Sequence, residues 1–394
     1  MFPASDTERC SSWRRCFAPG RMFSLAALWL GVGGVAGGSD LVPVATLTLP
    51  PSNHNAFTTT ARYNSDGILY AWDGFGVWRQ DGINSNAFTQ IGTVIGGNNE
   101  PANWYGTTGG AYNCADAGPI NFSGDGVRIL LGNGYGGWGP WNNPPQTNLS
   151  GLIWVMPISG GTVSLPGGDS PVAIVQYHTD FIPLPAASTI ENKATKYFVN
   201  QGVSGYESDP HSSILIFDET TGLAAVPVIV NGPGASTSLT FNPANNRLYA
   251  GVGYGAERGK IYSFGLDQLD SAFLSKSPLD FTTDGALFNP TAWNNQSGAG
   301  LFFDAHGYLF AGGNEGITCF APDGTVSAVL DMGYYTSLIY NPFNDQILAL
   351  TGSMGTIYNA SDFEAVPEPS IFVLIAIAAL GLLVRRARST IAAL

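Results

Sequence analysis

The sequence predicts an all-β fold, built as a β-propeller of six blades. Only 11% of the 394 residues are charged, whereas 51 are glycine and 12% are aromatic, a balance typical of short strands joined by many turns. A pattern of turn, strand, glycine-rich loop and second strand recurs six times between residues 68 and 358. Repeats of roughly 40 to 60 residues with three or four short strands each are typical of propeller blades.

Each repeat supplies two predicted strands. The first strands are expected at 68–71, 127–131, 197–199, 247–250, 308–311 and 346–350. The second strands are expected at 77–79, 153–155, 214–217, 260–264, 317–320 and 356–358. Three of the repeats are preceded by a similar element, which we interpret as the innermost strand of a blade. These elements lie at 239–243, 301–304 and 338–342.

A propeller also needs a closed ring. The last repeat stops at Asp362 with three strands, while residues 44–49 form a separate alternating strand near the start. Pairing these two segments would complete the last blade. Seven blades stay open as an alternative, because residues 163–190 fit no repeat. A β-sandwich or jelly roll, which also places a strand every 8 to 12 residues or so, is the other fold that the pattern allows.

The charge of the central region argues against nucleic acid as a partner. Between residues 39 and 366, nine Lys or Arg stand against 26 Asp or Glu, a net charge of −17. Binding nucleic acid requires clustered cations that displace counterions. Acidity of this kind most simply keeps a protein soluble.

The sequence indicates no metal and no cofactor. No Cys-x-x-Cys pair and no Cys/His spacing suited to zinc occurs. Cys114 and Cys319 could form a disulfide in an oxidising compartment, but they lie about 200 residues apart in different repeats, which favours two free thiols. The Asp-Gly pairs at 66–67, 125–126 and 323–324 lack the spacing of a calcium-binding EF-hand loop and are expected hairpin turns.

The N-terminus has the three-part layout of a secretory signal peptide. A basic segment is followed by an apolar run at 22–35 and by small residues at 36–38. The basic segment holds Arg9, Arg14, Arg15 and Arg21. A buried core helix is the alternative interpretation, and translation from Met1 or from Met22 both stay open.

The C-terminus carries a second apolar run, at 371–384, between two distinctive segments. Before the run stand Val366, Pro367, Glu368 and Pro369, and after it stand Arg385, Arg386 and Arg388. The prolines hold their segment extended, which would expose Glu368 to a processing enzyme. A helix over this run spans about 21 Å, short of the roughly 30 Å hydrocarbon core, so snorkelling arginines or a thinned bilayer would be needed. The arginines would stay cytoplasmic, which leaves everything before Pro367 outside.

This arrangement of Val-Pro-Glu-Pro-Ser, apolar run and Arg-Arg-Ala-Arg resembles the PEP-CTERM sorting signal of Gram-negative bacteria. The resemblance covers residues 366–388 only. It implies recognition by an exosortase, a membrane-embedded cysteine transpeptidase-like enzyme, with cleavage near residues 367–369. It further implies delivery to the cell surface or to an exopolysaccharide matrix, and nothing about the ectodomain. A plain C-terminal membrane anchor is the alternative, but such an anchor needs a longer helix and has no use for Pro-Glu-Pro.

The expected organisation follows from these parts. A signal peptide covers residues 1–38 and the propeller ectodomain covers 39–362, with its last blade closed by the strand at 44–49. A linker at 363–370 contains the Pro-Glu-Pro motif. A transmembrane helix at 371–384 and a basic cytoplasmic tail at 385–394 complete the chain.

Long insertions concentrate where a propeller opens on one face. They lie between second and third strands, at 132–150, 200–212 and 251–259, and between blades, at 96–118 and 282–300. Aromatic side chains among Asn, Asp and Glu suit sugar rings, which offer an apolar face and a hydroxyl edge. The alternative is that these aromatic residues fix their own loops to the sheet. The aromatic residues are Trp104, Tyr105, Tyr135, Trp138, Trp141, Tyr206, Tyr254 and Trp293.

Catalytic motifs are few. No serine-hydrolase elbow, zinc-protease helix, phosphate-binding loop or dinucleotide fingerprint occurs. His178 with Asp180, and Glu207, Asp209 and His211 in one loop, could form the acid/base group of a polysaccharide lyase or glycosidase. We therefore expect a non-catalytic exported propeller that binds exopolysaccharide or another surface partner. A polysaccharide lyase or hydrolase is the second expectation, and a purely structural surface protein is the third.

Overall fold

The computed structural model describes the body of the chain and leaves out both ends and several loops. The described residues are 36–37, 41–50, 60–73, 76–93, 119–132, 152–159, 162–163, 173–174, 180–201, 212–221, 225–234, 236–253, 255, 257–289, 300–313, 316–332 and 337–364. All of them belong to one compact unit, Val35–Leu394.

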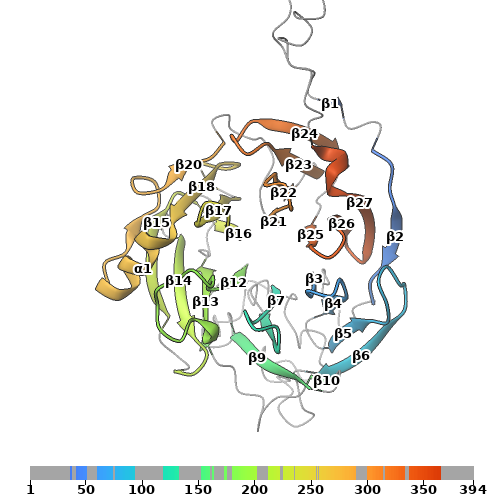
Figure 1. Ribbon diagram of the computed structural model, residues 1–394, viewed down its shortest axis with the longest axis horizontal. Coiled ribbons are helices and arrows are strands. Elements are labelled where there is room, and N and C mark those ends of the chain that lie inside the picture. The colour runs from blue at the N-terminus through green and yellow to red at the C-terminus, as the bar shows by residue number, and fades with distance from the viewer. Residues whose placement is uncertain are drawn as a thin grey trace, which may run out of the picture. The chain divides into compact units, whose positions relative to one another are not determined.

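The described strands form six sheets that surround a common axis (Figure 1). Blade 1 holds β3 (Thr60–Tyr63), β4 (Leu69–Trp72), β5 (Gly76–Gln80) and β6 (Phe88–Thr93). Blade 2 holds β7 (Ile120–Phe122), β8 (Arg128–Gly132), β9 (Leu152–Ser159), β10 (Thr162–Val163) and β11 (Ala173–Ile174). Blade 3 holds β12 (Phe181–Pro183), β13 (Lys196–Gln201), β14 (Ser212–Asp218), β15 (Val226–Gly232) and β19 (Leu279–Asp280).

The other three blades complete the ring. Blade 4 holds β16 (Ser236–Asn242), β17 (Arg247–Val252), β18 (Ile261–Gly265) and β20 (Ala286–Leu287). Blade 5 holds β21 (Leu301–Phe303), β22 (Leu309–Gly313), β23 (Gly316–Phe320), β24 (Val326–Asp331) and β1 (Ala36–Gly37). Blade 6 holds β25 (Ser337–Asn341), β26 (Gln346–Thr351), β27 (Met354–Asn359) and β2 (Ala45–Thr48). Pairing is antiparallel except where β19 meets β15 and β1 meets β24.

The six-bladed propeller predicted from the repeats is confirmed. The first predicted strand of each repeat is the second strand of a blade, and the second predicted strand is the third. The three elements interpreted as innermost strands are β16, β21 and β25. Residues 163–190 do not form a seventh blade in the part that is described, because β11 pairs within blade 2 and β12 begins blade 3.

The innermost strands close the ring around its axis. In order, β3, β7, β12, β16, β21 and β25 each contact the next, and β25 contacts β3. Since neighbouring strands of a blade run antiparallel, the turns after the first strands all lie on one side of the ring, which we call the turn face. The loops between second and third strands, and the connections between blades, lie on the other side, which we call the loop face.

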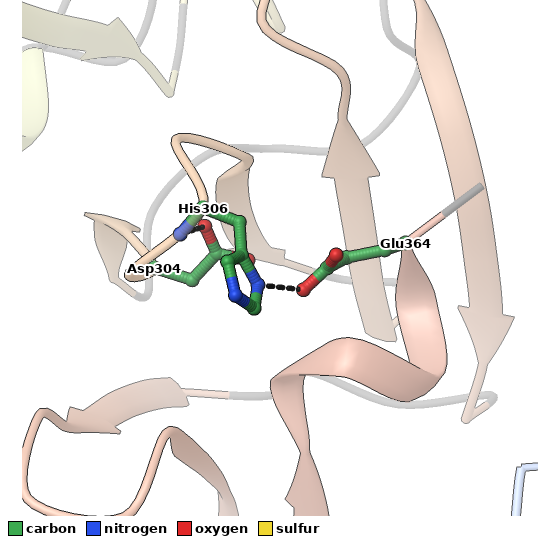
Figure 2. A group of neighbouring side chains, drawn as sticks. All are labelled: Asp304, His306 and Glu364. Carbon is green, nitrogen blue, oxygen red and sulfur yellow. Dashed lines mark hydrogen bonds and ion pairs between the residues drawn. The ribbon is translucent and has the colours of Figure 1, made fainter. Parts of the chain in front are cut away.

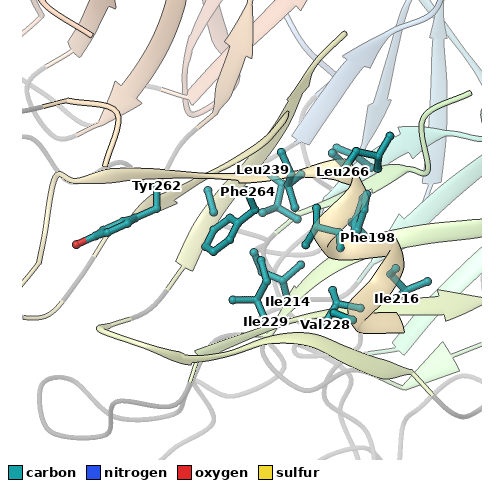
Figure 3. Close-up of a cluster of buried hydrophobic side chains, with 14 of the residues drawn as sticks. Phe198, Ile214, Ile216, Val228, Ile229, Leu239, Tyr262, Phe264 and Leu266 are labelled. Carbon is teal, nitrogen blue, oxygen red and sulfur yellow. The ribbon is translucent and has the colours of Figure 1, made fainter. Parts of the chain in front are cut away.

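Apolar packing between neighbouring blades forms the core. The described residues contain six hydrophobic clusters, each drawn from two adjacent blades. Figure 3 shows the cluster between blades 3 and 4, where Phe198 and Ile214 face Leu239 and Phe264. Because a blade is covered on both faces, its middle strands are apolar on both faces: every residue of β4, β18, β22 and β23 is buried.

Polar side chains fix the turns after the first strands. Asn64 Oδ1 accepts hydrogen bonds from the backbone N–H of residues 66 and 68, and Asn341 Oδ1 accepts one from residue 343. Asn242 accepts one from residue 244, and Ser123 accepts one from the N–H of Arg128. In blade 5 the corresponding residue is Asp304. These side chains replace the backbone hydrogen bonds that the ladder cannot supply in a tight turn.

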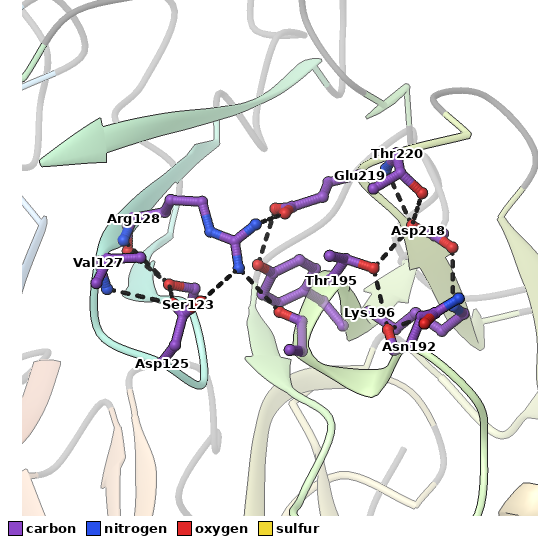
Figure 4. A network of polar contacts seen from close by, with 12 residues as sticks. Ser123, Asp125, Val127, Arg128, Asn192, Thr195, Lys196, Asp218, Glu219 and Thr220 are labelled. Carbon is purple, nitrogen blue, oxygen red and sulfur yellow. Dashed lines mark hydrogen bonds and ion pairs between the residues drawn. The ribbon is translucent and has the colours of Figure 1, made fainter.

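An ion-pair network ties blades 2 and 3 together on the turn face (Figure 4). The Arg128 guanidinium pairs with Glu219 and Asp125, and the Tyr197 hydroxyl donates to the same Glu219 carboxylate. The Lys196 ammonium lies 2.8 Å from Asp218. These contacts join charged groups of blades 2 and 3, although the buried Arg128 Nε–H has no hydrogen-bond partner among the described residues.

One helix was not predicted from the sequence. α1 (Leu266–Ser275) follows β18 directly and packs on the outer side of the ring against β15 and β18. Leu266, Leu269 and Ala272 recur at helical spacing and enter the cluster between blades 3 and 4. The buried Asp270 carboxylate accepts hydrogen bonds from the hydroxyls of Ser188 and Thr189, which fixes the helix to blade 3.

Two further expectations can be compared with the described residues. Cys319 is a free, fully buried thiol, whereas Cys114 lies outside the described residues. None of the described helices is long and apolar enough to cross a bilayer. The transmembrane helix expected at 371–384 lies outside the described residues, and so does the signal peptide expected at 1–38 except for residues 36–37, which form β1 and pair with β24 of blade 5.

The N-terminal strand closes the last blade. β2 pairs antiparallel with β27, with Ala45 opposite Ile357 and Thr48 opposite Met354. This is the pairing expected from the sequence. Leu47 of β2 is 2% exposed and belongs to the cluster between blades 6 and 1.

Shortening Leu47 should therefore destabilise the whole ring. We expect Leu47→Ala to lower the free energy of unfolding by about 2 to 5 kcal/mol, the usual cost of truncating a buried leucine. Thr46→Ala changes an exposed neighbour in the same strand and should stay within about 0.5 kcal/mol of the wild type. Urea unfolding followed by tryptophan fluorescence measures both. Equal, small effects would show that β2 is not part of the cooperative fold.

Candidate functional site

The sequence-predicted binding aromatics all lie outside the described residues. These residues are Trp104, Tyr105, Tyr135, Trp138, Trp141, Tyr206, Tyr254 and Trp293. The strand ends that bound their loops are described, and they all lie on the loop face. Four of the five acid/base candidates are also outside the described residues, namely His178, Glu207, Asp209 and His211.

Asp180 is the described member of the predicted acid/base group. It immediately precedes β12, the innermost strand of blade 3, so it lies on the loop face near the ring axis. Its carboxylate Oδ2 accepts a hydrogen bond of 2.8 Å from the backbone N–H of Leu239 in blade 4. Its own N–H donates to the buried Asn200 side chain at 2.7 Å. The residue is thus held from two neighbouring blades.

Hydrogen bonds of this kind join other innermost strands, but through neutral groups. The Asn121 amide donates to the carbonyl oxygen of Phe181 at 2.7 Å, which joins blades 2 and 3. The Ser238 hydroxyl accepts from the N–H of Gly300 at 3.2 Å, which joins blades 4 and 5. A neutral side chain is therefore sufficient to join two innermost strands, and the negative charge of Asp180 is not needed for that hydrogen bond.

The charge of Asp180 is close enough to Arg62 for the two to influence each other's pKa. Arg62 lies in β3, the innermost strand of blade 1, and its guanidinium interacts electrostatically with Asp180. Burial raises the pKa of Asp180 to about 6, and Arg62 opposes this rise by favouring the carboxylate. Burial likewise lowers the pKa of Arg62, which Asp180 opposes. Asp180 lies at the loop-face end of β12, and Arg62 lies within β3, two residues before the turn at Asn64.

This arrangement suits a ligand with hydroxyl or carboxylate groups. The guanidinium offers several fixed N–H donors, and a carboxylate offers acceptors. A carboxyl group with a pKa near 6 can also take up or release a proton near neutral pH. Asp180 was named from the sequence, whereas Arg62 was missed, because nothing local to residue 62 reveals that it faces residue 180.

A second cluster of ionisable residues lies on the turn face. Among the described residues, Asp304, His306 and Glu364 bring potential ligand atoms within 4.8 Å of one another. The cluster has no signal in the sequence, because Glu364 follows His306 by 58 residues and only the ring brings the two together.

Comparisons with known proteins bear on the fold alone. No protein-family model and no curated protein matches the chain. The structure of regucalcin, a calcium-binding protein from Agrobacterium tumefaciens, matches with a TM-score of 0.50 and 10% identity over 80% of this chain and 95% of that one. A gluconolactonase from Xanthomonas campestris matches with a TM-score of 0.47 and 10% identity over 80% of this chain and 98% of that one. At such identity the likeness to regucalcin supports the propeller fold and says nothing about activity.

The raised pKa of Asp180 predicts a pH dependence of stability. Because the folded-state pKa of about 6 lies above the value of 3.8 without the fold, the folded protein binds this proton more tightly. The stability that protonation contributes is fully present below about pH 4 and is lost as the pH rises through 6, by about 2 to 3 kcal/mol.

Urea unfolding between pH 4 and 7 tests this expectation. In the wild type the free energy of unfolding should fall between about pH 4 and pH 6 because Asp180 loses its proton. Asp180→Asn should not show this fall. Arg62→Met removes the cation that favours the carboxylate, so the loss should move to higher pH in that variant. Parallel pH profiles for all three proteins would mean that the two side chains do not interact.

Proposed function

We propose that the chain is an exported surface or matrix protein of a Gram-negative bacterium, sorted by an exosortase, whose propeller binds exopolysaccharide on the loop face without cleaving it. The observation that carries the binding proposal is the carboxylate of Asp180 at the loop-face end of an innermost strand, which interacts electrostatically with Arg62. It lies on the face where the aromatic-bearing loops begin and end. Donor and acceptor groups at the axis, together with aromatic residues in the loops, would match the hydroxyl edges and apolar faces of sugars.

The sorting part of the proposal is supported by the sequence of the C-terminus. Val366, Pro367, Glu368 and Pro369 directly follow the propeller, whose last described residue is Glu364. Arg385, Arg386 and Arg388 follow the apolar run. A tail of this kind would hold the propeller at the bacterial membrane until the processing enzyme releases it. Nucleic acid and cofactors have no part in this proposal.

An enzyme acting on polysaccharide is the second candidate. The observation that favours it is the raised pKa of Asp180, about 6, since general acids and bases work best with a pKa near the working pH. Glycosidases generally use two carboxyl groups. Among the residues named from the sequence, Glu207 or Asp209 would supply the second. A purely structural surface protein is the third candidate.

Glycan retention distinguishes these candidates. We expect the secreted protein to be retained on the host's own exopolysaccharide, and replacing Trp138 and Trp141 with Ala to weaken retention at least about tenfold, a cost typical of a central aromatic contact. Phe343→Ala is the matched control, because Phe343 is an aromatic residue 59% exposed on the opposite face. Unchanged retention in the tryptophan variant would remove these loops from the binding site.

The same incubation reports on catalysis. New reducing ends or unsaturated ends, absent with Asp180→Asn, would make the protein a hydrolase or lyase. Loss of matrix integrity in a deletion strain, without measurable sugar affinity, would indicate the structural role.

Sorting has its own test. Replacing Glu368 with Ala should leave the full-length precursor in the membrane fraction and abolish release, because the extended motif is what the processing enzyme would recognise. Asp362→Ala, in the last turn of the propeller, should be processed normally. Immunoblots of membrane and extracellular fractions measure both variants. Normal release of the Glu368 variant would contradict exosortase sorting.

A further inference from the structure

The turn that follows β21 in blade 5 differs from the corresponding turns of other blades in one respect. Asp304 Oδ1 accepts hydrogen bonds from the N–H of His306 at 2.9 Å and of Tyr308 at 2.8 Å. Asn64, Asn242 and Asn341 perform this task with neutral amides. A charged side chain is therefore not needed to form the turn.

The second oxygen of Asp304 is buried without a partner. The residue is only 7% exposed, and its Oδ2 makes no hydrogen bond to any described group. A buried carboxylate oxygen that lacks a partner costs free energy comparable to a lost charged hydrogen bond. The amide nitrogen of Asn341, at the same position in blade 6, is also buried without a partner, but it cannot ligate a cation, whereas the orphan oxygen of Asp304 can.

His306 and Glu364 lie beside the Asp304 carboxylate (Figure 2). His306 Nδ1 is 2.6 Å from Glu364 Oε1, and the potential ligand atoms of all three residues lie within 4.8 Å of one another. The His306 side chain is 57% exposed and the Glu364 side chain 20% exposed, so an ion in solution can reach the cluster. Glu364 reaches it from the end of the short helix η4 (Ala360–Phe363), which follows β27.

Negative charge exceeds positive charge around this cluster. Asp345, which accepts a hydrogen bond from the Tyr340 hydroxyl at 2.7 Å, lies close enough to act on both Asp304 and His306. Burial raises the pKa of Asp304, and Glu364 and Asp345 raise it further. Glu364 also raises the pKa of His306. One imidazolium cannot balance three carboxylates, whereas a divalent cation would.

We propose that Asp304, His306 and Glu364 bind a divalent transition-metal ion, for which Zn²⁺ is the natural probe. An imidazole nitrogen with two carboxylate oxygens suits zinc or a similar ion, whereas calcium and magnesium prefer oxygen ligands alone. Ligand atoms about 2.1 Å from such an ion lie roughly 3.4 Å apart in a tetrahedral site. The His306–Glu364 pair would thus open by less than about 1 Å, which the exposed imidazole permits.

The site is independent of the proposed glycan site. It lies on the turn face, whereas Asp180 lies at the loop-face end of β12, so either proposal can fail alone. Three protein ligands leave a tetrahedral position for water or for an external ligand.

Zinc titration of the full chain, purified in mild detergent and freed of metal with a chelator, tests the proposal. Isothermal titration calorimetry with ZnCl₂ should show a tight site, and thermal unfolding should shift upward on adding zinc, because an ion that binds only the folded state stabilises it. CaCl₂ at the same concentration should give no comparable shift.

Three variants assign the site. Asp304→Asn keeps the oxygen that forms the turn, as in blades 1, 4 and 6, and should fold normally without zinc while losing at least about tenfold in zinc affinity. His306→Ala and Glu364→Gln should lose as much. Asp323→Asn is the matched control, because this carboxylate occupies another turn of blade 5 and its hydrogen bonds stay within that turn.

Two results would overturn the proposal. One is the absence of a zinc-dependent shift in the wild type. The other is wild-type zinc affinity in the three variants, which would place any bound zinc elsewhere, for example on the cysteines or histidines outside the described residues.

Discussion

The structure depends on one constraint: each blade has two apolar faces, and only another blade can cover them. The six hydrophobic clusters satisfy this constraint, since each joins two adjacent blades and together they return to the start. An open row of blades would leave one face exposed at each end, at a cost of about 25 cal/mol per Å² of apolar surface. The ring therefore follows from the apolar composition of the middle strands.

The repetition of the blade makes unusual residues visible, because the other blades serve as references. Innermost strands are joined by the neutral Asn121 and Ser238, so the charge of Asp180 stands out there. First turns are formed by neutral residues in blades 1, 2, 4 and 6, so Asp304 stands out in the same way. Both exceptions lie beside other ionisable groups. In each case a charged residue stands where the other blades have a neutral one, and this difference indicates a binding site more clearly than the residue type alone.

The blades could be predicted because their signals are local: short apolar strands, Asn and Asp turns, and recurrence along the chain. The closing strand at 44–49 also shows alternating apolar and polar residues. α1 was missed because a helix as short as its ten residues, Leu266–Ser275, depends on packing against blade 3, which no local pattern reveals. Arg62 and Glu364 were missed for a related reason, since their partners are distant in sequence and only the ring brings them together. The aromatic loops and the C-terminal tail keep the status of predictions.

The pairing of β2 with β27 also has a kinetic consequence. Ala45 meets Ile357 across about 300 residues of sequence, so the last blade cannot form until nearly the whole chain has left the ribosome. Until then, β2 lacks its partner β27 and offers a strand edge to any other chain nearby. A chaperone that keeps the early segments apart would therefore increase the yield of closed rings. A chain whose synthesis stops after blade 5 would keep this strand edge exposed and would aggregate.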